Sequence, residues 1–559
     1  MPSRSASDNG AHRGAASRQP APPELPPRRW ITAFFCLVTL AWVFAFTPTP
    51  LVFATVPGIV GWLAVVERSR SLKEAFLWVV IFGAVATIAG YSWLAQTIQD
   101  FGGIPSVWSW VLTGLFGVWN TIHGWIFVVL YRVMLKRGRR PHPLVTAALL
   151  AACESLPIRM FAWTAGHGAV DVPPLLQNAE WGGVAAVSFV LLCLVIPVYE
   201  LGRWAFVRGG AAARPKAALV TFAIGAAFFL FGMTRYDRVR AEEADTTESL
   251  RVAIVQPNVG ANLKREATHN GGRARINSIA AYRRGTERAA REGADLIVWP
   301  ESAITDAIPM GDTVQTNQYL RGLQYGYLNE VGRDHALLIG LYEQGPRGRA
   351  SVVTGKPLPS RYNVAALRQP GDTNAPWTTY RKVFLIPFGE MMPLGLSEDL
   401  LPQNFKMLAG QMPQPMLETR GLKLAPFLCY EGILPDHVRE YVDGERPDIL
   451  MSLTNDSWFG DTWEPHQHLN FTRFRAVEHR VPMVRSTNTG ISAFISATGD
   501  VEARLGVGEE GVLVREVPLV EREPTIYVRY GHRFPVLLWI LALGGVLLSL
   551  LRPPPVLRD

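Results

Sequence analysis

Apolar residues are gathered into long uninterrupted segments, and this distribution constrains the fold of the 559-residue chain more than any other feature. Residues 30–233 are nearly all apolar apart from short basic loops, whereas residues 240–530 have the composition of an ordinary water-soluble protein. A last apolar run covers residues 535–551. Because about 20 consecutive apolar residues span the hydrocarbon core of a bilayer, the sequence predicts a membrane protein that carries one large water-soluble domain.

Eight apolar segments are predicted to cross the membrane, seven before the water-soluble domain and one after it. They cover residues 30–46, 50–66, 75–97, 107–131, 143–158, 181–200, 216–233 and 535–551. The first, second and fifth are short for a complete crossing, which leaves open that some are tilted or re-entrant. His123 and Glu154 are ionisable residues inside these segments, and for both a position near a helix end and a functional role stay open.

Lysine and arginine residues are concentrated in alternate loops. The loops after the second, fourth and sixth segments are basic, whereas those after the first and third contain neither residue. The positive-inside rule then predicts that both termini are cytoplasmic and that the water-soluble domain lies on the periplasmic face of a bacterial inner membrane. Since topology explains these basic loops, the net charge of +8 is not taken as a sign of nucleic-acid binding.

The expected domain organisation follows from these segments. Residues 1–29, rich in Ser, Ala, Pro and Arg, are predicted to form a disordered cytoplasmic tail. Residues 30–233 form the membrane domain, 245–525 the water-soluble domain, and 535–551 the last membrane helix. The segment Gly166 to Gln177 is expected to be an outer loop that helps to form a lipid entrance.

The water-soluble domain alternates apolar strand patterns with amphipathic helix patterns, which is typical of a layered α/β sandwich. Strands are expected near 251–256, 295–299, 336–340, 361–367, 377–386, 421–428, 448–453, 483–487 and 491–497. Helices are expected near 275–292, 316–333, 433–443 and 466–480.

Cys429 ends the apolar strand pattern Leu424–Leu428 and is the only cysteine of the water-soluble domain. A disulfide within that domain is therefore excluded. A lone thiol in an oxidising compartment is readily oxidised, so its presence there suggests a function. A thiol held rigidly at a strand end is well placed to act as a nucleophile. The alternative is that Cys429 is a small buried apolar residue, as most free cysteines are.

Two residues on other predicted strands, or just after them, form a chemically consistent set with Cys429. Glu301 follows the strand at 295–299, and Lys382 lies within the one expected at 377–386. Alone, Glu301 is more often a solvated turn residue, and Lys382 a side chain reaching toward water. Together, the carboxylate can take the thiol proton of Cys429, and the ammonium can stabilise the thiolate and a later oxyanion. The backbone N–H of Tyr430 is a second candidate oxyanion donor.

In this order, Glu301, Lys382 and Cys429 resemble the Glu-Lys-Cys triad of the nitrilase, or carbon–nitrogen hydrolase, superfamily. With the membrane segments, residues 30–551 resemble the bacterial apolipoprotein N-acyltransferase family. The supporting motifs are W-P-E-S at 299–302, Y-N-V-A at 362–365, K-x-x-L-x-P-F-G-E at 382–390, C-Y-E at 429–431, N-D-S-W-F-G at 455–460, Q-H at 467–468, R-A-V-E at 475–478 and R-S-T-N-T-G at 485–490.

The resemblance implies an αββα nitrilase-like catalytic domain on a helical membrane domain. It implies that Glu301 is the base, Lys382 the oxyanion stabiliser and Cys429 the nucleophile. Glu390 matches a second essential glutamate that orients Lys382 or assists proton transfer. Tyr430 and Glu431 match residues beside the nucleophile, although Glu431 is as readily interpreted as a structural ion-pair partner.

The resemblance also implies a two-step acyl transfer. Cys429 takes an acyl chain from a membrane phospholipid as a thioester and passes it to the α-amine of the N-terminal diacylglyceryl-cysteine of a lipoprotein. Neither a cofactor nor a metal is implied, and a monomer is expected. The apolar residues 391–396 and 405–408 are candidates for a lid over the acyl chain, with packing on the domain itself as the alternative.

Other classes of protein were weighed against this interpretation. His466 and His468 with Asp461 and Glu464 are poorly spaced for a metal site. A glycine-rich phosphate loop is not found in a strand–turn–helix setting, so a nucleotide enzyme is disfavoured. A membrane-tethered amidase that uses water as second substrate stays open, although one anchor would suffice for it. A non-catalytic binding protein would be expected to lack a triad residue, and all three are present.

Overall fold

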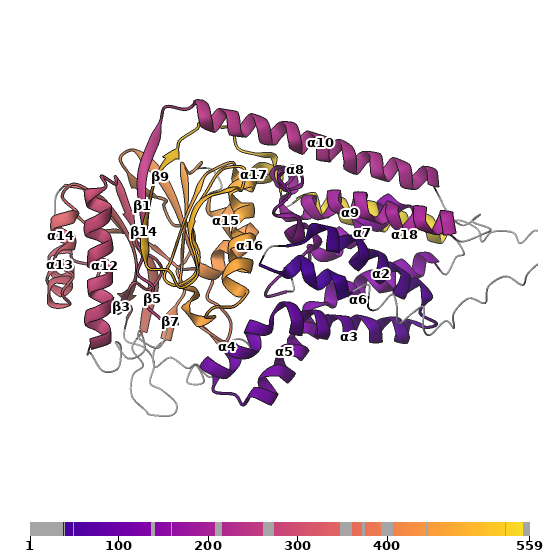
Figure 1. Ribbon diagram of the computed structural model, residues 1–559, viewed down its shortest axis with the longest axis horizontal. Coiled ribbons are helices and arrows are strands. Elements are labelled where there is room, and N and C mark those ends of the chain that lie inside the picture. The colour runs from indigo at the N-terminus through magenta and orange to yellow at the C-terminus, as the bar shows by residue number, and fades with distance from the viewer. Residues whose placement is uncertain are drawn as a thin grey trace, which may run out of the picture.

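A helical part and an α/β part make up the protein, and the long helix α10 (Pro215–Asp245) reaches from one to the other (Figure 1). The computed structural model describes Leu37 and residues 40–48, 50–135, 140–157, 159–206, 215–260, 273–346, 360–371, 375–392, 406–442, 445–531 and 533–551. The predicted tail at 1–29 lies outside these residues.

The helical part is a multi-pass membrane domain. Its helices are α2 (Thr55–Arg68), α3 (Leu72–Gly90), α4 (Ser92–Gly102), α5 (Ser106–Asn120), α6 (Ile122–Leu135), α7 (Pro143–Glu154), α8 (Pro173–Leu176), α9 (Ala179–Phe206) and α18 (Arg533–Leu551), with the short 3-10 helices η1 (Ala41–Phe46), η2 (Val52–Ala54) and η3 (Ala165–Ala169). Among the described residues, five stretches are long and apolar enough to cross a bilayer: Leu72–Gly90, Ser106–Leu135, Ala179–Ala205, Pro215–Asp245 and Arg533–Leu551. Eight crossings therefore stay a prediction.

Two predicted membrane segments are not single regular helices. Tyr91 has φ −126° and ψ 36° and separates α3 from α4, which divides the segment 75–97. Thr121 separates α5 from α6 within 107–131, and its hydroxyl donates to the carbonyls of Gly117 and Val118. Such side-chain bonds compete with the helical ladder. The break at Tyr91 matters most, because it faces the candidate site.

The segment 166–177 is packed into the molecule and is not an open outer loop. It forms η3 and α8, and His167 is only 4% exposed. The His167 ring lies 4.4 Å from the ring of Phe471 and 5.0 Å from that of Phe474, both in helix α16 (Glu464–His479) of the α/β part. The segment therefore seats the α/β part on the membrane helices.

Two stacked sheets form the centre of the α/β part. In the first, the order is β14 (Gly511–Pro518), β1 (Ser249–Gln256), β2 (Leu296–Val298), β4 (Ala336–Gln344), β5 (Ser360–Arg368) and β6 (Thr378–Arg381), with β3 (Ile304–Ile308) on β4 and β7 (Lys406–Leu408) on β5. In the second, the order is β13 (Val501–Leu505), β12 (Ser492–Ile495), β11 (Met483–Thr487), β10 (Ile449–Thr454), β9 (Leu422–Leu428) and β8 (Leu417–Thr419).

Helices cover the outer face of each sheet, which confirms the predicted αββα sandwich. Helices α12 (Arg273–Arg291), α13 (Thr313–Gly322) and α14 (Leu328–Val331) cover the first sheet, and α15 (Pro435–Tyr441) and α16 cover the second, on the side of the membrane helices (Figure 1). Strands β1, β2 and β4 run parallel, as do β9, β10 and β11. Their residues are buried on both faces, which explains their continuous apolar sequences.

Several element predictions were wrong in extent. The strand expected at 377–386 ends at Arg381, because the Glu431 carboxylate accepts the N–H groups of Val383 and Phe384 that a longer strand would offer to a neighbour. The helix expected at 316–333 is divided into α13 and α14, and Gln324 between them has φ 68°. The elements not predicted from the sequence are β3, β7, β8, β13, β14 and α17 (Ile526–Tyr530).

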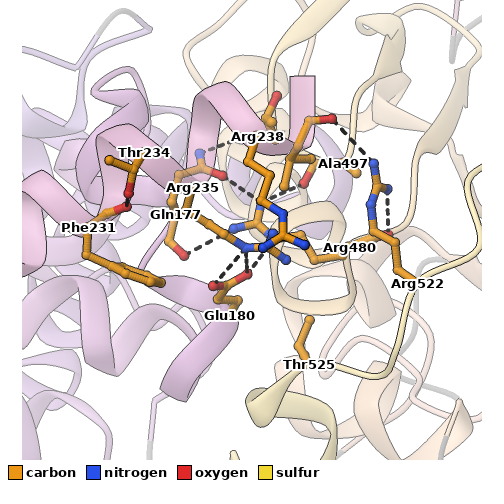
Figure 2. Close-up of polar contacts among 12 residues, drawn as sticks. Gln177, Glu180, Phe231, Thr234, Arg235, Arg238, Arg480, Ala497, Arg522 and Thr525 are labelled. Atoms are coloured by element: carbon orange, nitrogen blue, oxygen red, sulfur yellow. Dashed lines mark hydrogen bonds and ion pairs between the residues drawn. The ribbon is translucent and has the colours of Figure 1, made fainter. Parts of the chain in front are cut away.

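One buried arginine joins the two parts. Arg480 follows the last residue of α16 and is 1% exposed. Its guanidinium donates to Glu180 Oε2 at 2.8 Å, to Gln177 Oε1 at 2.6 Å and to the carbonyl of Ala497 at 3.0 Å (Figure 2). Arg235 of α10 reaches the same carboxylate at 2.9 Å, so Glu180 ties α16 and α10 to the start of α9. Breaking such a buried network is costly, which favours one fixed seating of the α/β part.

Candidate active site

Cys429 lies at the end of β9 and begins the 3-10 helix η6 (Cys429–Ile433), where the sequence places a nucleophile. Its φ is 50°, a left-handed conformation that costs energy for any residue other than glycine. Such strain persists only where the surroundings hold it, and it turns the side chain out of the sheet. The residue is half-buried, so its sulfur lies at a rigid strand end within reach of a substrate.

Glu301 follows β2 and is 4% exposed. A Cβ atom at Gly340, in the neighbouring strand β4, would lie 2.3 Å from the Pro300 carbonyl oxygen, so glycine is required for the backbone at Glu301 to approach that strand. Asn363 of β5 donates to Glu301 Oε1 at 2.6 Å. This side chain belongs to the Y-N-V-A motif, but its contact with Glu301 was not predicted from the sequence.

Lys382 lies just past the end of β6, not inside a strand, and is 1% exposed. Its Nζ donates to Glu301 Oε1 at 3.1 Å and to Glu390 Oε1 at 2.9 Å. The other Glu390 oxygen accepts the N–H of Ile386 at 2.9 Å. The structure therefore brings Glu301, Lys382 and Glu390 into one buried network, in which both carboxylates accept from the lysine.

The charges of this network set the protonation of the site. Burial alone would lower the pKa of Lys382, but Glu301 and Glu390 outweigh it and hold that pKa well above its usual range. Burial raises the pKa of Glu301, and Lys382 opposes this rise. Burial and the charge of Glu301 raise the pKa of the Cys429 thiol well above its usual range, although Lys382 acts to lower it. The resting site therefore holds a thiol, and its attack on a substrate needs a base.

Alkylation of Cys429 by iodoacetamide is expected to be slow at neutral pH. Since only the thiolate reacts and the pKa is raised, the rate should still be rising above about pH 8.5, the ordinary value for a cysteine thiol. The measurement is carbamidomethylation at Cys429 against pH, followed by peptide mass spectrometry. A rate that already reaches its plateau at pH 7 would contradict a protonated resting site.

Glu431 is fully buried and points into the backbone around the site. Its carboxylate accepts from the N–H groups of Val383 at 2.6 Å, Phe384 at 3.1 Å and Leu428 at 2.8 Å, and from the Tyr380 hydroxyl at 3.0 Å. These bonds tie the segment after Lys382 to the residue before Cys429. The geometry thus favours the structural interpretation of Glu431 over a chemical one.

Glu431→Gln is expected to lower the free energy of unfolding by about 3 kcal/mol at neutral pH, because an amide cannot accept all these bonds. Burial alone would raise the pKa of Glu431, but His437 and the Leu428 N–H lower it overall. The stabilisation is therefore complete above the ordinary carboxyl value and is lost as pH falls through the lowered pKa. Thermal unfolding in detergent should show a gap between the variant and wild type at pH 7 that narrows under acid conditions.

The matched control for this prediction is Glu440→Gln in α15, where the side chain is 66% exposed. This control should unfold like the wild type at every pH. An equal loss in both variants, or none in Glu431→Gln, would contradict the assigned role.

An apolar pocket surrounds Cys429, and its walls come from both parts of the protein. Tyr91, Trp93 and Phe161 contribute from the membrane domain, and Phe459 and Phe471 from the α/β part. The break between α3 and α4 is held from across the pocket. Gln467 donates to the carbonyl of Gly90 at 2.8 Å and accepts from Trp93 Nε1 at 2.9 Å. A site for apolar substrate groups is therefore assembled only where the two parts meet.

The candidate lid is only partly described. Met391 is 37% exposed, and Phe384 and Phe388 before it are 44% and 56% exposed. Met407 is buried at 5%. Residues 393–405 lie outside the described part, so the lid stays a prediction.

Of the four residues considered as metal ligands, two lie in a cluster of possible ligand atoms. The structure gathers Glu464 and His468 with Asp456, within 4.8 Å of one another, and Asp461 and His466 are not members of the cluster. Arg485 lies 3.1 Å from Asp456 Oδ2, and Thr454 donates to Oδ1 at 3.0 Å. The guanidinium already supplies the positive charge that a cation would bring, so the cluster suits a hydrogen-bond network better than a metal.

Comparisons with known proteins identify the family of the chain. Residues 251–527 match the carbon-nitrogen hydrolase family, and residues 28–196 match the apolipoprotein N-acyltransferase N-terminal domain. The apolipoprotein N-acyltransferase of Bdellovibrio bacteriovorus is 30% identical over 545 residues, 93% of each chain, and that of Azotobacter vinelandii is 32% identical over 487 residues, 84% of this chain and 86% of that one. An amidase from Nesterenkonia sp. is 21% identical, with a TM-score of 0.30, over 48% of this chain and 90% of that one. Through its full-length relatives, the chain belongs to the apolipoprotein N-acyltransferase family of multi-pass membrane acyltransferases.

Proposed function

We propose that the protein moves an acyl chain from a membrane phospholipid, through a thioester on Cys429, to the α-amine of the N-terminal diacylglyceryl-cysteine of a lipoprotein. The observation that carries the proposal is the pocket at Cys429, because part of its aromatic wall (Tyr91, Trp93 and Phe161) comes from the membrane domain. A water-soluble amide would not need that wall. An acyl chain that enters from the bilayer would bury its apolar surface there.

In the first step, Glu301 takes the Sγ proton as Cys429 attacks the ester carbonyl carbon. The Lys382 ammonium and the Tyr430 N–H stabilise the tetrahedral oxyanion. When the carbon–oxygen ester bond breaks, the proton passes from Glu301 to the departing alkoxide. The products are the thioester and a lysophospholipid. The raised pKa of Cys429 supports this role for Glu301, because the resting thiol cannot attack without losing its proton.

In the second step, the lipoprotein amine attacks the thioester carbon. Glu301 takes a proton from the nitrogen, the carbon–sulfur bond breaks, and the thiolate leaves and regains that proton. The product is an amide. A thioester suits this step because it reacts readily with amines, and the apolar pocket limits competition by water.

We also propose that the α/β part lies on the periplasmic face and both termini in the cytoplasm. Basic loops that are distant in sequence support this topology by meeting at one end of the helices. Glu67 at the end of α2 accepts from Tyr131 at 2.6 Å and from Tyr199 at 2.9 Å, and it also contacts Arg140 and Arg203. Positive charge gathered at one end marks the cytoplasmic side.

The test of the proposed function uses two synthetic acceptors that differ at one atom. Purified protein is incubated with phospholipid and a diacylglyceryl-cysteinyl peptide whose α-amine is free, or with the same peptide acetylated. The free amine is expected to gain one acyl chain by mass, and the acetylated peptide none. Release of free fatty acid without acylated peptide would favour the amidase-like alternative, in which water is the acceptor.

A further inference from the structure

The buried ring of His468 lies beside the nucleophile, in the lining of the same pocket. His468 is 5% exposed and belongs to the second turn of α16. Its Nε2 lies 3.3 Å from the backbone carbonyl oxygen of Cys429, and its Nδ1 lies 3.0 Å from Asp456 Oδ1. The ring touches no reacting atom of the proposed mechanism, yet it bonds to the peptide group that carries the second oxyanion donor.

That peptide group couples His468 to the oxyanion site. The carbonyl of Cys429 and the N–H of Tyr430 belong to one planar peptide and point in opposite directions. Fixing the carbonyl toward His468 therefore fixes the direction of the N–H, which points away from the ring. We propose that His468 is a positioning residue that holds the Tyr430 N–H in place as the oxyanion donor. The inference rests on the proposed role of Cys429 as nucleophile.

The orientation of this peptide group is not fixed by hydrogen bonds within the 3-10 helix. Cys429 has φ 50°, and the first N–H groups of a 3-10 helix have no acceptor within that helix. Rotation of the peptide would turn the Cys429 carbonyl oxygen toward the oxyanion position, where two negative oxygens would repel. A hydrogen-bond donor on α16 fixes that carbonyl in the productive orientation. It also satisfies the hydrogen-bonding need of the carbonyl oxygen.

The contact between Nε2 and the Cys429 carbonyl indicates a hydrogen on Nε2, because a carbonyl oxygen can only accept. Arg485 lies 3.1 Å from Asp456 and Thr454 also donates to it, so this carboxylate stays ionised beside Nδ1. Glu464 Oε1 lies 3.6 Å from Nδ1, and burial raises the pKa of Glu464 well above its usual range. Burial and Arg485 lower the pKa of His468, whereas Asp456 acts to raise it. Nε2 can donate to the Cys429 carbonyl in the protonated ring and in the neutral ring that carries its hydrogen on Nε2.

Two substitutions of His468 distinguish the contribution of Nε2 from that of Nδ1. The side-chain amide of His468→Gln can still donate to the Cys429 carbonyl, whereas that of His468→Asn reaches only the position of Nδ1. Each variant, with His466→Asn as a matched control from the half-exposed neighbouring turn, is acylated with a p-nitrophenyl ester, and kcat and KM are measured. His468→Asn is expected to lower kcat by about 100-fold with KM little changed, as for loss of one oxyanion donor, and His468→Gln by less than about tenfold.

The rate of Cys429 alkylation by iodoacetamide distinguishes loss of the oxyanion donor from a general structural defect, because only a general defect would change that rate. Alkylation forms no oxyanion, so its rate should stay within about twofold of wild type in both variants. The inference is overturned by equal losses of kcat in the two variants, by an alkylation rate that falls with kcat, or by full activity of His468→Asn. If His468→Asn does not fold, His468→Phe fills the ring volume without a donor and carries the same expectation.

The ester probe also separates this inference from the proposed function. A wild-type protein that reacts with the p-nitrophenyl ester but never with phospholipid would contradict phospholipid as donor. The comparison of His468→Asn with His468→Gln would still decide the role of the ring.

Discussion

Cys429→Ala is expected to abolish acyl transfer to a lipopeptide while the protein stays folded in detergent. The proposed reaction passes through a covalent bond to Sγ, and no other cysteine among the described residues lines the pocket. Removing the sulfur leaves Glu301 and Lys382 in place but gives the acyl chain no acceptor on the enzyme. Activity is measured as the mass gain of the free-amine lipopeptide described above.

Cys193→Ala is the matched control for that substitution. Cys193 is fully buried in α9, so its replacement tests whether removal of a thiol from the apolar interior is itself harmful. It should retain nearly all transfer activity. Measurable multiple turnover by Cys429→Ala would mean that the acyl chain moves directly from lipid to amine, and the thioester route would be wrong.

Glu301→Gln is expected to lower kcat by about 1,000-fold or more, since a positioned general base contributes roughly 10²–10⁴. The amide has nearly the same shape, so Asn363 and Lys382 keep a neighbour at the same place. It cannot take the thiol proton, however. KM should change little, because the pocket that holds the acyl chain is untouched. The measurement is steady-state transfer to the lipopeptide at saturating phospholipid.

Glu343→Gln provides the comparison for Glu301→Gln. Glu343 is 7% exposed in the neighbouring strand β4 and pairs with Arg381 at 2.7 Å, next to Lys382 in sequence. Its loss disturbs a buried carboxylate close to the site without removing the proposed base. A fall in kcat for Glu301→Gln no larger than that for Glu343→Gln would contradict the assignment of Glu301.

The sequence predicted the sandwich fold from local patterns, and the network around Lys382 from strand ends together with the family resemblance. Continuous apolar strands between amphipathic helices indicate a sheet covered on its outer face. Cys429 directly follows such a strand and Glu301 lies three residues past the end of another, and strand ends bring side chains to one edge. Lys382 needed a family motif, because the strand expected around it ends one residue earlier.

Contacts between distant segments could not be predicted in the same way. Tyr91 interrupts a membrane helix in front of Cys429, and Gln467, more than 370 residues later, holds that break. Gly340 permits the close approach at Glu301, and Asn363 bonds its carboxylate. The hydropathy pattern does not predict these contacts, since each depends on how two separate elements pack.

The roles of single residues within a motif could not be assigned from the sequence either. Glu431 stands two residues from Cys429, and its sequence position fits chemistry and structure equally well. Only its four backbone and hydroxyl donors assign it to the scaffold. His468 was weighed as a metal ligand, whereas its contacts with Cys429 and Asp456 indicate a role in the backbone of the site.

The most direct test of the account is the intact mass of the purified protein after incubation with phospholipid and no acceptor. The account predicts that wild type gains the mass of one fatty-acyl group, that hydroxylamine removes it as expected for a thioester, and that Cys429→Ala gains nothing. A folded, detergent-dispersed wild type that takes up no acyl group, or an adduct of equal size on Cys429→Ala, would contradict a Cys429 thioester as the intermediate.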